Sequence, residues 1–263
     1  MKPRLRLLSG KPKPKSDEPL LKVCGVRKLF PSGGDYRRVL EDMEFSARSG
    51  ELICILGRSG CGKTTLLKIL AGFTPPSAGS VSVNGRPVTT PGPDRGVVFQ
   101  EDALFPWLTV RENIAFGLRH KMPRGKVKTE VDRFLDLVGL SEFGDYLPKE
   151  ISGGMKQRVA LARVLILKPQ VLLMDEPFAA LDAQSREEMQ NLLLSLWKTL
   201  SHTILFVTHD VSEAVTLADR ILLMEKAPGR IREDIRVDLP RPRKTDTDRF
   251  LFFCRQLYEG LKD

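Results

Sequence analysis

Short apolar runs bounded by turn-forming residues recur along most of this chain. Three of them lack the alternation of a half-exposed strand, because each contains four or five consecutive apolar residues. Such runs are typical of strands that are buried on both faces of a sheet. They are ELICIL at 51–56, VLLMD at 171–175 and TILFVTH at 203–209.

Helical periodicity separates these runs. Residues 63–71 predict a helix that ends at Gly72, and the chain from about 103 to 165 is mostly helical in pattern. A further helix is predicted before 203–209, and another at 246–261. One face of the long helical stretch is defined by Val127, Val131, Phe134, Leu135 and Val138, and one face of the helix before 203–209 by Met189, Leu192, Leu196 and Leu200.

Weaker patterns predict the remaining strands. They lie at 20–30, 39–47, 96–100 and within 221–238, with a hairpin at 79–88 that turns at Asn84 and Gly85. Strands that alternate with helices predict an α/β fold with a parallel sheet, into which the helical stretch is inserted as a lobe. Residues 1–19 are rich in Pro and Lys and are predicted to form a disordered basic tail.

Composition fits a globular protein. The chain has 263 residues, of which 41% are hydrophobic and 29% charged, enough for one sizeable core with a smaller lobe. No apolar run is long enough to span a bilayer, and the apolar part of the N-terminus is too short for a signal peptide, so we expect a cytoplasmic location. The four cysteines form no ligand cluster, and Cys54 is predicted to be a small core residue.

The net charge of +9 leaves three interpretations open. Lys and Arg gather in the first fifteen residues and again at 241–244. These ends could be solvated tails, contacts to an anionic membrane surface, or contacts to nucleic acid.

The stretch GRSGCGKTT predicts a phosphate-binding loop. Its spacing G-x-x-x-x-G-K-[ST] is met by Gly57, Gly62, Lys63 and Thr64, between a buried strand and a helix. Glycines let successive N–H groups point at one anion, the helix adds its positive end, Lys63 adds a point charge and Thr64 offers a hydroxyl to Mg²⁺. The alternative is a glycine-rich linker. The predicted contact residues are Gly57, Arg58, Ser59, Gly60, Cys61, Gly62, Lys63, Thr64 and Thr65.

Four polar residues at strand ends could act on the bound phosphate. Asp175 suits the Mg²⁺ shell, and Glu176 could deprotonate a water molecule as a general base, although both could instead be solvated loop carboxylates. His209 could contact the terminal phosphate or the water, although a lone histidine is often an ordinary residue. Gln100 could reach metal or water through its amide oxygen.

The stretch ISGGMKQRVALARVL (151–165), together with GRSGCGKT and LLMDEPFAALD, resembles the nucleotide-binding subunit of ATP-binding cassette transporters. The resemblance covers about residues 20–240. It implies a P-loop NTPase core of the RecA-like type, with an inserted α-helical subdomain at about 103–165 and an antiparallel β subdomain. Residues 241–263 would then form a C-terminal helical extension.

The resemblance also implies how ATP and Mg²⁺ are used. Ser152, Gly153 and Gly154 would act on the nucleotide held by a second subunit, so that two chains arranged head to tail complete two ATP sites. Asp182 would lie in the loop that crosses this interface. The chain departs from the family pattern at Met155, commonly Gln, and at Ala179, commonly Ser, and each change removes one polar group.

The residue that stacks on adenine stays open at this point. Phe30 matches the family's aromatic, Tyr36 is a rival because PSGGDYRR lengthens this region, and Phe30 could instead be a core aromatic.

A narrower resemblance concerns the transport system. The stretches at 96–118 and 176–197, with APGRI (227–231) and DLPRPR (238–243), are similar to importers of nitrate, sulfonates and taurine. This implies a peripheral subunit on the cytoplasmic face of the inner membrane, most simply a homodimer, with a transmembrane permease and a periplasmic substrate-binding protein as partners and no nucleic acid. The alternatives are a different importer, or a DNA-associated ATPase, which would carry a coiled coil or a zinc module. A P-loop kinase would not explain ISGGMKQ.

Overall fold

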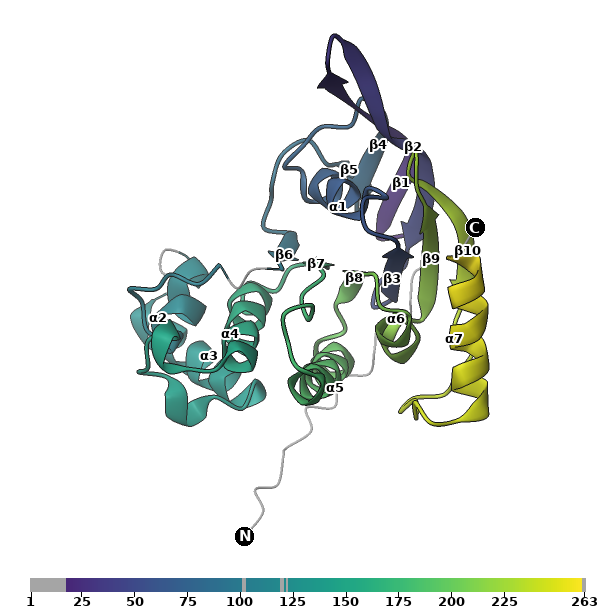
Figure 1. Ribbon diagram of the computed structural model, residues 1–263. Coiled ribbons are helices and arrows are strands. Elements are labelled where there is room, and N and C mark those ends of the chain that lie inside the picture. The colour runs from purple at the N-terminus through teal and green to yellow at the C-terminus, as the bar shows by residue number, and fades with distance from the viewer. Residues whose placement is uncertain (1–17, 101–102, 119–120, 122, 262–263) are drawn as a thin grey trace.

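The chain folds around two sheets (Figure 1). The computed structural model describes residues 18–100, 103–118, 121 and 123–261. The larger sheet has six strands, in the spatial order β10 (Arg230–Arg236), β9 (Arg220–Glu225), β3 (Leu52–Gly57), β8 (Thr203–Thr208), β7 (Val171–Asp175) and β6 (Arg95–Val98). The smaller sheet has the order β2 (Asp35–Ala47), β1 (Leu21–Ser32), β4 (Ala78–Val83) and β5 (Arg86–Pro87). The larger sheet is parallel except for β10, and the smaller one is antiparallel.

The α-helices are α1 (Lys63–Ala71), α2 (Val110–Ala115), α3 (Arg124–Leu137), α4 (Gly153–Leu165), α5 (Ala183–Leu200), α6 (Val211–Leu217) and α7 (Asp248–Gly260), with 3₁₀ turns at Phe116–Leu118, Ser141–Phe143 and Pro148–Glu150. Some of them cover the two faces of the larger sheet, whereas α2 packs against α3 and α4 in the helical lobe. Figure 1 shows α1 on one face with the smaller sheet, and α4, α5 and α6 on the other. In the described part of the chain, no helix is both long and apolar enough to cross a membrane.

The two faces of the central strands build two separate cores. Along β3, Ile53 and Ile55 pack in the core that contains α1 and the smaller sheet, whereas Leu52, Cys54 and Leu56 pack in the core of the other helices. Because side chains alternate along a strand, a run that is apolar at every position fills both cores at once. The predicted burial of Cys54 is therefore confirmed, with 0% exposure.

Most predicted elements are confirmed, and the differences have local causes. The helix at 63–71 and the Asn84–Gly85 turn lie where the sequence placed them, with φ of 51° and 72° at the two turn residues. The strand predicted from 39 begins at Asp35, because Gly33 and Gly34 take positive φ and make a two-residue turn.

Three other details were not predicted. The strand expected at 96–100 ends at Val98, and the short helix α6 gave no usable periodicity in the sequence. In α5 the buried residues include Leu193, whereas Leu192 and Leu200 are only half-buried. The predicted disordered tail lies outside the described residues, apart from its last two positions.

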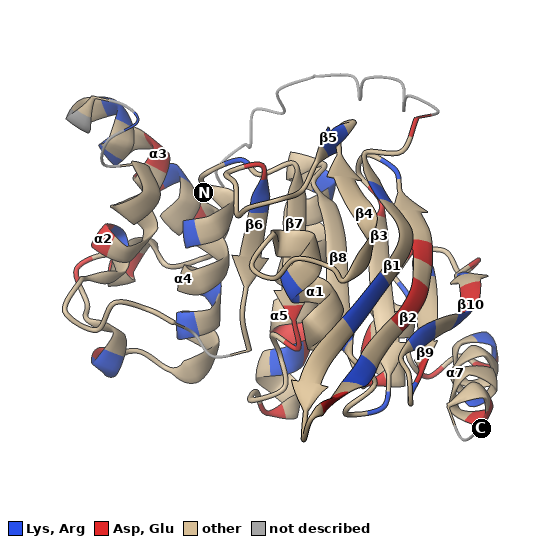
Figure 2. Ribbon diagram, turned by 90° about the horizontal axis from the view of Figure 1, so that it is seen from above, with Lys and Arg blue, Asp and Glu red and all other residues tan. Residues whose placement is uncertain are grey.

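The helical lobe and the C-terminal helix lie at opposite ends of the molecule. Figure 2 shows α2 and α3 at one end of the molecule and α7 at the other, beside β9 and β10. Basic and acidic segments are interspersed along β1 and β2 in this view, and Arg27 and Arg38 both pair with Glu41, at 3.0 and 2.5 Å. Basic side chains on these strands are therefore locally paired with an acidic one.

The helical lobe depends on a buried amide in α2. Asn113 is 0% exposed, and its Oδ1 accepts from the backbone N–H of Phe105 at 2.9 Å. Its Nδ2 donates to the carbonyls of Phe105, Leu108 and Thr109 at 3.1, 2.9 and 3.0 Å. One side chain thus satisfies the backbone of a loop that has no regular structure of its own.

We expect Asn113→Leu to lower the free energy of unfolding by about 1–3 kcal/mol, because buried backbone groups lose their partners without space being created. Urea denaturation followed by circular dichroism measures this change. The matched control is Asn191→Leu at an exposed position of α5. An equal effect of the two substitutions would contradict the role given to Asn113.

Candidate functional site

The predicted phosphate loop connects β3 to α1. A Cβ at Gly57 would lie 2.7 Å from Cys61 Sγ and 2.9 Å from the Met224 carbonyl oxygen, so a larger residue does not fit. Gly60 and Gly62 have φ of +81° and +100°, which disfavours other residues. Gly62 is the N-cap of α1 and has no side chain, so the first backbone amides of this helix have no side-chain acceptor. An anion is the natural acceptor for such a helix end.

Lys63 lies within this loop and is 4% exposed. Its Nζ donates to the carbonyls of Gly57 at 2.7 Å and Arg58 at 3.3 Å, and it lies 3.5 Å from Glu176 Oε1. The loop therefore folds around an ammonium group. The contact with Glu176 brings the loop together with the end of β7.

Thr64 and Asp175 meet although 111 positions separate them. Thr64 Oγ1 donates to Asp175 Oδ1 at 3.3 Å, and Asp175 is the last residue of β7. Burial raises the pKa of the Asp175 carboxyl, while the bond from Thr64 acts in the opposite direction. A hydroxyl and one carboxylate are a fitting oxygen donor set for Mg²⁺, which usually takes its other ligands from phosphates and water.

Glu176 has an unusual backbone. Its φ is +43°, a left-handed conformation that costs a non-glycine residue roughly 1–3 kcal/mol. Its N–H donates to the Val207 carbonyl at 3.0 Å, which ties the turn to β8. This conformation holds Oε1 near Lys63, while Oε2 lies 2.7 Å from His209 Nδ1. One carboxylate thus joins the loops that follow β3, β7 and β8.

Gln100 is not brought into this cluster. It lies beyond the end of β6 and is exposed. Its backbone carbonyl accepts a bond of 3.5 Å from Gln157 Nε2. Among the described residues, no hydrogen bond joins Gln100 to Thr64 or Asp175. Its predicted metal contact stays a prediction.

The glycines after Ser152 begin α4, away from the phosphate loop. Ser152 caps this helix, with Oγ accepting from the Met155 N–H at 3.3 Å. Asp182 caps α5 in the same manner, accepting from the Ser185 N–H at 2.9 Å. Both helices lie on the face of the sheet opposite α1 (Figure 1). In the described part of the chain, no hydrogen bond or ion pair links the start of α4 to the phosphate loop.

The two candidate aromatics lie near the tip of the β1–β2 hairpin. Phe30 is 39% exposed, so its assignment as a core aromatic is wrong, and Lys28 Nζ lies 5.0 Å from its ring centroid. Tyr36 is 72% exposed and pairs with Pro31, one position further along the ladder. Both rings are available to a ligand, and the choice between them stays open.

Two residues, Cys61 inside the phosphate loop and Gly229 outside it, contribute to the packing of this loop. Cys61 is 1% exposed, and burial raises the pKa of its thiol, so it behaves as a small packing residue. Gly229, in the β9–β10 connection, was not predicted as part of the site. A Cβ there would lie 2.0 Å from the Cys61 carbonyl oxygen, and its backbone exchanges 2.9 Å hydrogen bonds with Val39 and Glu41. A single glycine in APGRI gave no sign of this long-range contact.

Comparison with known proteins places these features in one family. The family described as ABC transporter matches residues 40–179. The taurine import ATP-binding protein of Roseobacter denitrificans is 50% identical over 205 residues, covering 78% of this chain and 76% of that protein. The nitrate import ATP-binding protein of Synechococcus elongatus is 44% identical over 225 residues, covering 84% and 82%.

A solved structure agrees with these relatives. The dimer of an ATP-binding cassette in a post-hydrolysis state, bound to ADP and phosphate, superposes with a TM-score of 0.72. The two chains are 29% identical, and the match covers 84% of this chain and 100% of that one. The fold class predicted from the sequence is confirmed by this likeness.

We expect Gly229→Ala to weaken ATP binding about tenfold, since a displacement of the phosphate loop that costs about 1.4 kcal/mol has that effect. Titration of a fluorescent ATP analogue measures the affinity. Gly125→Ala is the matched control, because a Cβ there meets no atom within 4 Å. An unchanged affinity in Gly229→Ala would show that the β9–β10 connection does not constrain the loop.

Proposed function

This chain belongs to the ABC transporter family, and we propose that it is the ATP-hydrolysing subunit of an importer. The proposal rests on one observation above all. Glu176 lies between Lys63 and His209, at 3.5 and 2.7 Å, beside a loop built to hold phosphate.

Each residue of this cluster has a chemical task. The amides of residues 57–65 bind the phosphates of ATP, and Lys63 places its charge against them. Thr64 and Asp175 would hold Mg²⁺, which neutralises phosphate charge when it is bound, and Gln100 is proposed to approach the same site.

Glu176 is proposed as the general base. It takes a proton from the attacking water, while His209 holds the carboxylate through Oε2. Lys63 then stabilises negative charge that builds on the phosphate in the transition state. The left-handed backbone of Glu176 supports this assignment, because strained residues cluster at functional sites.

A second copy is needed to complete each site. The start of α4 and the phosphate loop belong to opposite faces of the sheet, and both suit an anion. Two copies arranged head to tail bring Ser152, Gly153 and Gly154 of one chain to the nucleotide of the other, with Asp182 at the crossing between them. The dimeric state of the related cassette supports this arrangement.

The cargo is proposed to be a small anion. Relatives named for taurine and nitrate import support taurine, an alkanesulfonate or nitrate as the transported solute. A transmembrane permease and a periplasmic substrate-binding protein would be the other components, with this subunit on the cytoplasmic face of the inner membrane. The alternative is the ATPase of a different importer or of a DNA-associated system.

Glu176→Gln should keep ATP binding and lower the ATPase rate by about 10²–10⁴-fold, the usual contribution of a general base. It should also accumulate as an ATP-bound dimer on size-exclusion chromatography. Glu187→Gln, an exposed acidic residue of α5, is the control for the change in charge. Undiminished turnover in Glu176→Gln would rule out the assigned base.

Deleting this subunit from cells should abolish ATP-dependent uptake of one of three labelled anions, taurine, an alkanesulfonate or nitrate. Wild-type protein should restore that uptake and Glu176→Gln should not, because transport needs hydrolysis. Normal uptake of all three anions in the deletion strain would contradict the proposed cargo. ATPase assays of the purified chain test the enzymatic part independently.

A further inference from the structure

The loop that carries His209 is built on a very short helix. His209 directly follows β8, and α6 begins two residues later with Asp210 as its N-cap. At seven residues, α6 is only about 10 Å long and would be unstable as an isolated helix. Its position must therefore come from contacts with the rest of the chain.

The backbone around His209 is tied to this helix on both sides. Thr208 Oγ1 donates to Glu213 Oε2 at 2.7 Å and accepts from the Asp210 N–H at 2.9 Å. Asp210 Oδ1 accepts from the Glu213 N–H at 3.1 Å. The side chain of His209 is 59% exposed, so packing around the ring contributes little to its position. Because the residues on either side of His209 are bonded to α6, a shift of α6 would move the histidine.

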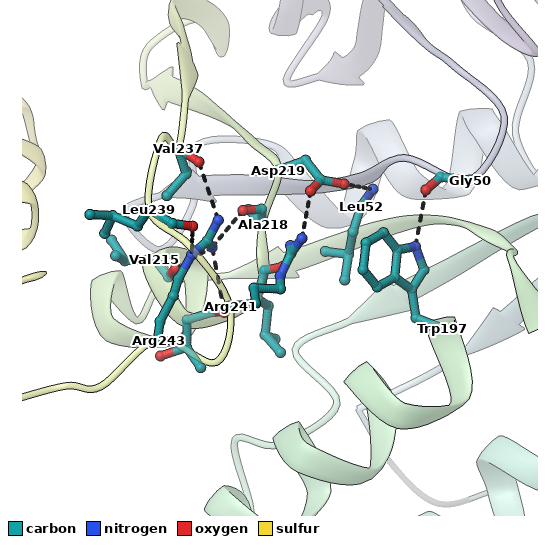
Figure 3. A network of polar contacts seen from close by, with 12 residues as sticks. Gly50, Leu52, Trp197, Val215, Ala218, Asp219, Val237, Leu239, Arg241 and Arg243 are labelled. Carbon is teal, nitrogen blue, oxygen red and sulfur yellow. Dashed lines mark hydrogen bonds and ion pairs between the residues drawn. The ribbon is translucent and has the colours of Figure 1, made fainter. Parts of the chain in front are cut away.

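Two arginines of the DLPRPR stretch cap the opposite end of α6 (Figure 3). The final carbonyls of a helix have no partner within it. Here Arg243 Nη1 donates to the carbonyls of Val215 and Ala218 at 2.6 Å and reaches Thr216 at 3.5 Å. Arg241 Nη2 donates to the Leu217 carbonyl. Every carbonyl from 215 to 218 thus accepts a bond from one of these two guanidinium groups, which we call the arginine cap.

The arginine cap also joins α6 to the strand that leads into the phosphate loop. Arg241 Nη1 donates to Asp219 Oδ1 at 2.6 Å, and Asp219 Oδ2 accepts from the Leu52 N–H at 3.0 Å, at the start of β3. The Arg241 guanidinium lies 4.6 Å from the Trp197 ring centroid, and Trp197 Nε1 donates to the Gly50 carbonyl at 3.1 Å. Figure 3 shows these contacts as one connected network.

Arg243 is held by carbonyl oxygens instead of a carboxylate. It also reaches the carbonyls of Val237 and Leu239, at 3.2 and 3.0 Å, and no ion pair to it occurs among the described residues. Burial and the neighbouring charge of Arg241 lower the pKa of Arg243 to about 10, which leaves it charged at neutral pH. A cation at a helix C-terminus is favoured by the helix dipole, and only arginine offers a fork of five donors.

We propose that Arg241 and Arg243 are positioning residues for ATP hydrolysis: by capping α6 they hold His209 in contact with Glu176. This inference rests on the proposed function. It assigns a positioning role to DLPRPR, a stretch that lies outside the nucleotide motifs of the sequence. The arginine cap binds the C-terminal end of α6, whereas His209 lies next to its N-terminal end, about 10 Å away.

The kinetic test compares Arg243→Met with Lys244→Met in the full chain. Lys244 is the adjacent, exposed cation, so both variants lose one positive charge. We expect Arg243→Met to lower kcat about 10- to 100-fold, because small misplacements of catalytic groups have effects of this size. The KM for ATP should stay within about twofold, since the phosphate loop is untouched. Lys244→Met should match wild type.

A spectroscopic arm separates positioning from general damage. The chain has three histidines, so the ring signals of His209 can be assigned by their loss in His209→Ala. We expect these signals to shift in Arg243→Met and to stay in place in Lys244→Met. Arg243→Lys, which keeps the charge with fewer donors, replaces the methionine variant if that variant does not fold, and it should show the same shift with a smaller loss of kcat.

Unmoved His209 signals, or a kcat equal to that of wild type, would overturn the inference. A kcat loss that persists with the same factor in the His209→Ala background would overturn it as well, because it would show that Arg243 does not act through the histidine. Absence of ATPase activity in the wild-type chain would instead refute the proposed function, whereas the ring signals would still report on the arginine cap.

Discussion

The site depends on one carboxylate that three loops share. Glu176 meets Lys63 with one oxygen and His209 with the other, at 3.5 and 2.7 Å. Its neighbours come from the ends of β3 and β8, and Glu176 itself follows β7. In a parallel sheet the carboxyl ends of adjacent strands lie at one edge, so residues that follow β3, β7 and β8 can meet there. The strained backbone of Glu176 is then stabilised by its bond to Val207.

Each face of the larger sheet packs against a different set of elements and carries a different anion-binding helix start. One core packs α1 and the smaller sheet against the strands, and the other packs α4, α5 and α6 against the same strands. Each face presents a helix start that suits an anion, and the rigid layer between them keeps these starts apart. In the proposed head-to-tail pair, the start of α4 in one copy would therefore serve the nucleotide held by the other copy.

Support for the site comes from chain segments that carry no reactive group. Gly229 presses the β9–β10 connection against Cys61 of the phosphate loop, where only a residue without Cβ fits. The arginine cap closes the end of α6 and reaches β3 through Asp219. Both segments belong to stretches, APGRI and DLPRPR, that resemble those of particular importers. These stretches lie outside the nucleotide motifs, and we propose that they help to position the loops that bind the nucleotide.

The sequence by itself determined the local chemistry. The phosphate loop, the helix at 63–71, the Asn84–Gly85 turn and the doubly buried strands follow from requirements met within a few residues, such as positive φ at glycines and continuous apolar runs. Only the tertiary structure decided which distant residues meet. Thr64 and Asp175 are 111 positions apart, and α6, which places His209, is too short to show a period of its own. The spatial order of β9, β3, β8 and β7 differs from their order in the chain, and that order brings Glu176, His209 and Gly229 to the loop after β3. It arises from packing both sheet faces at once, a constraint that acts on the whole chain and that no short stretch contains.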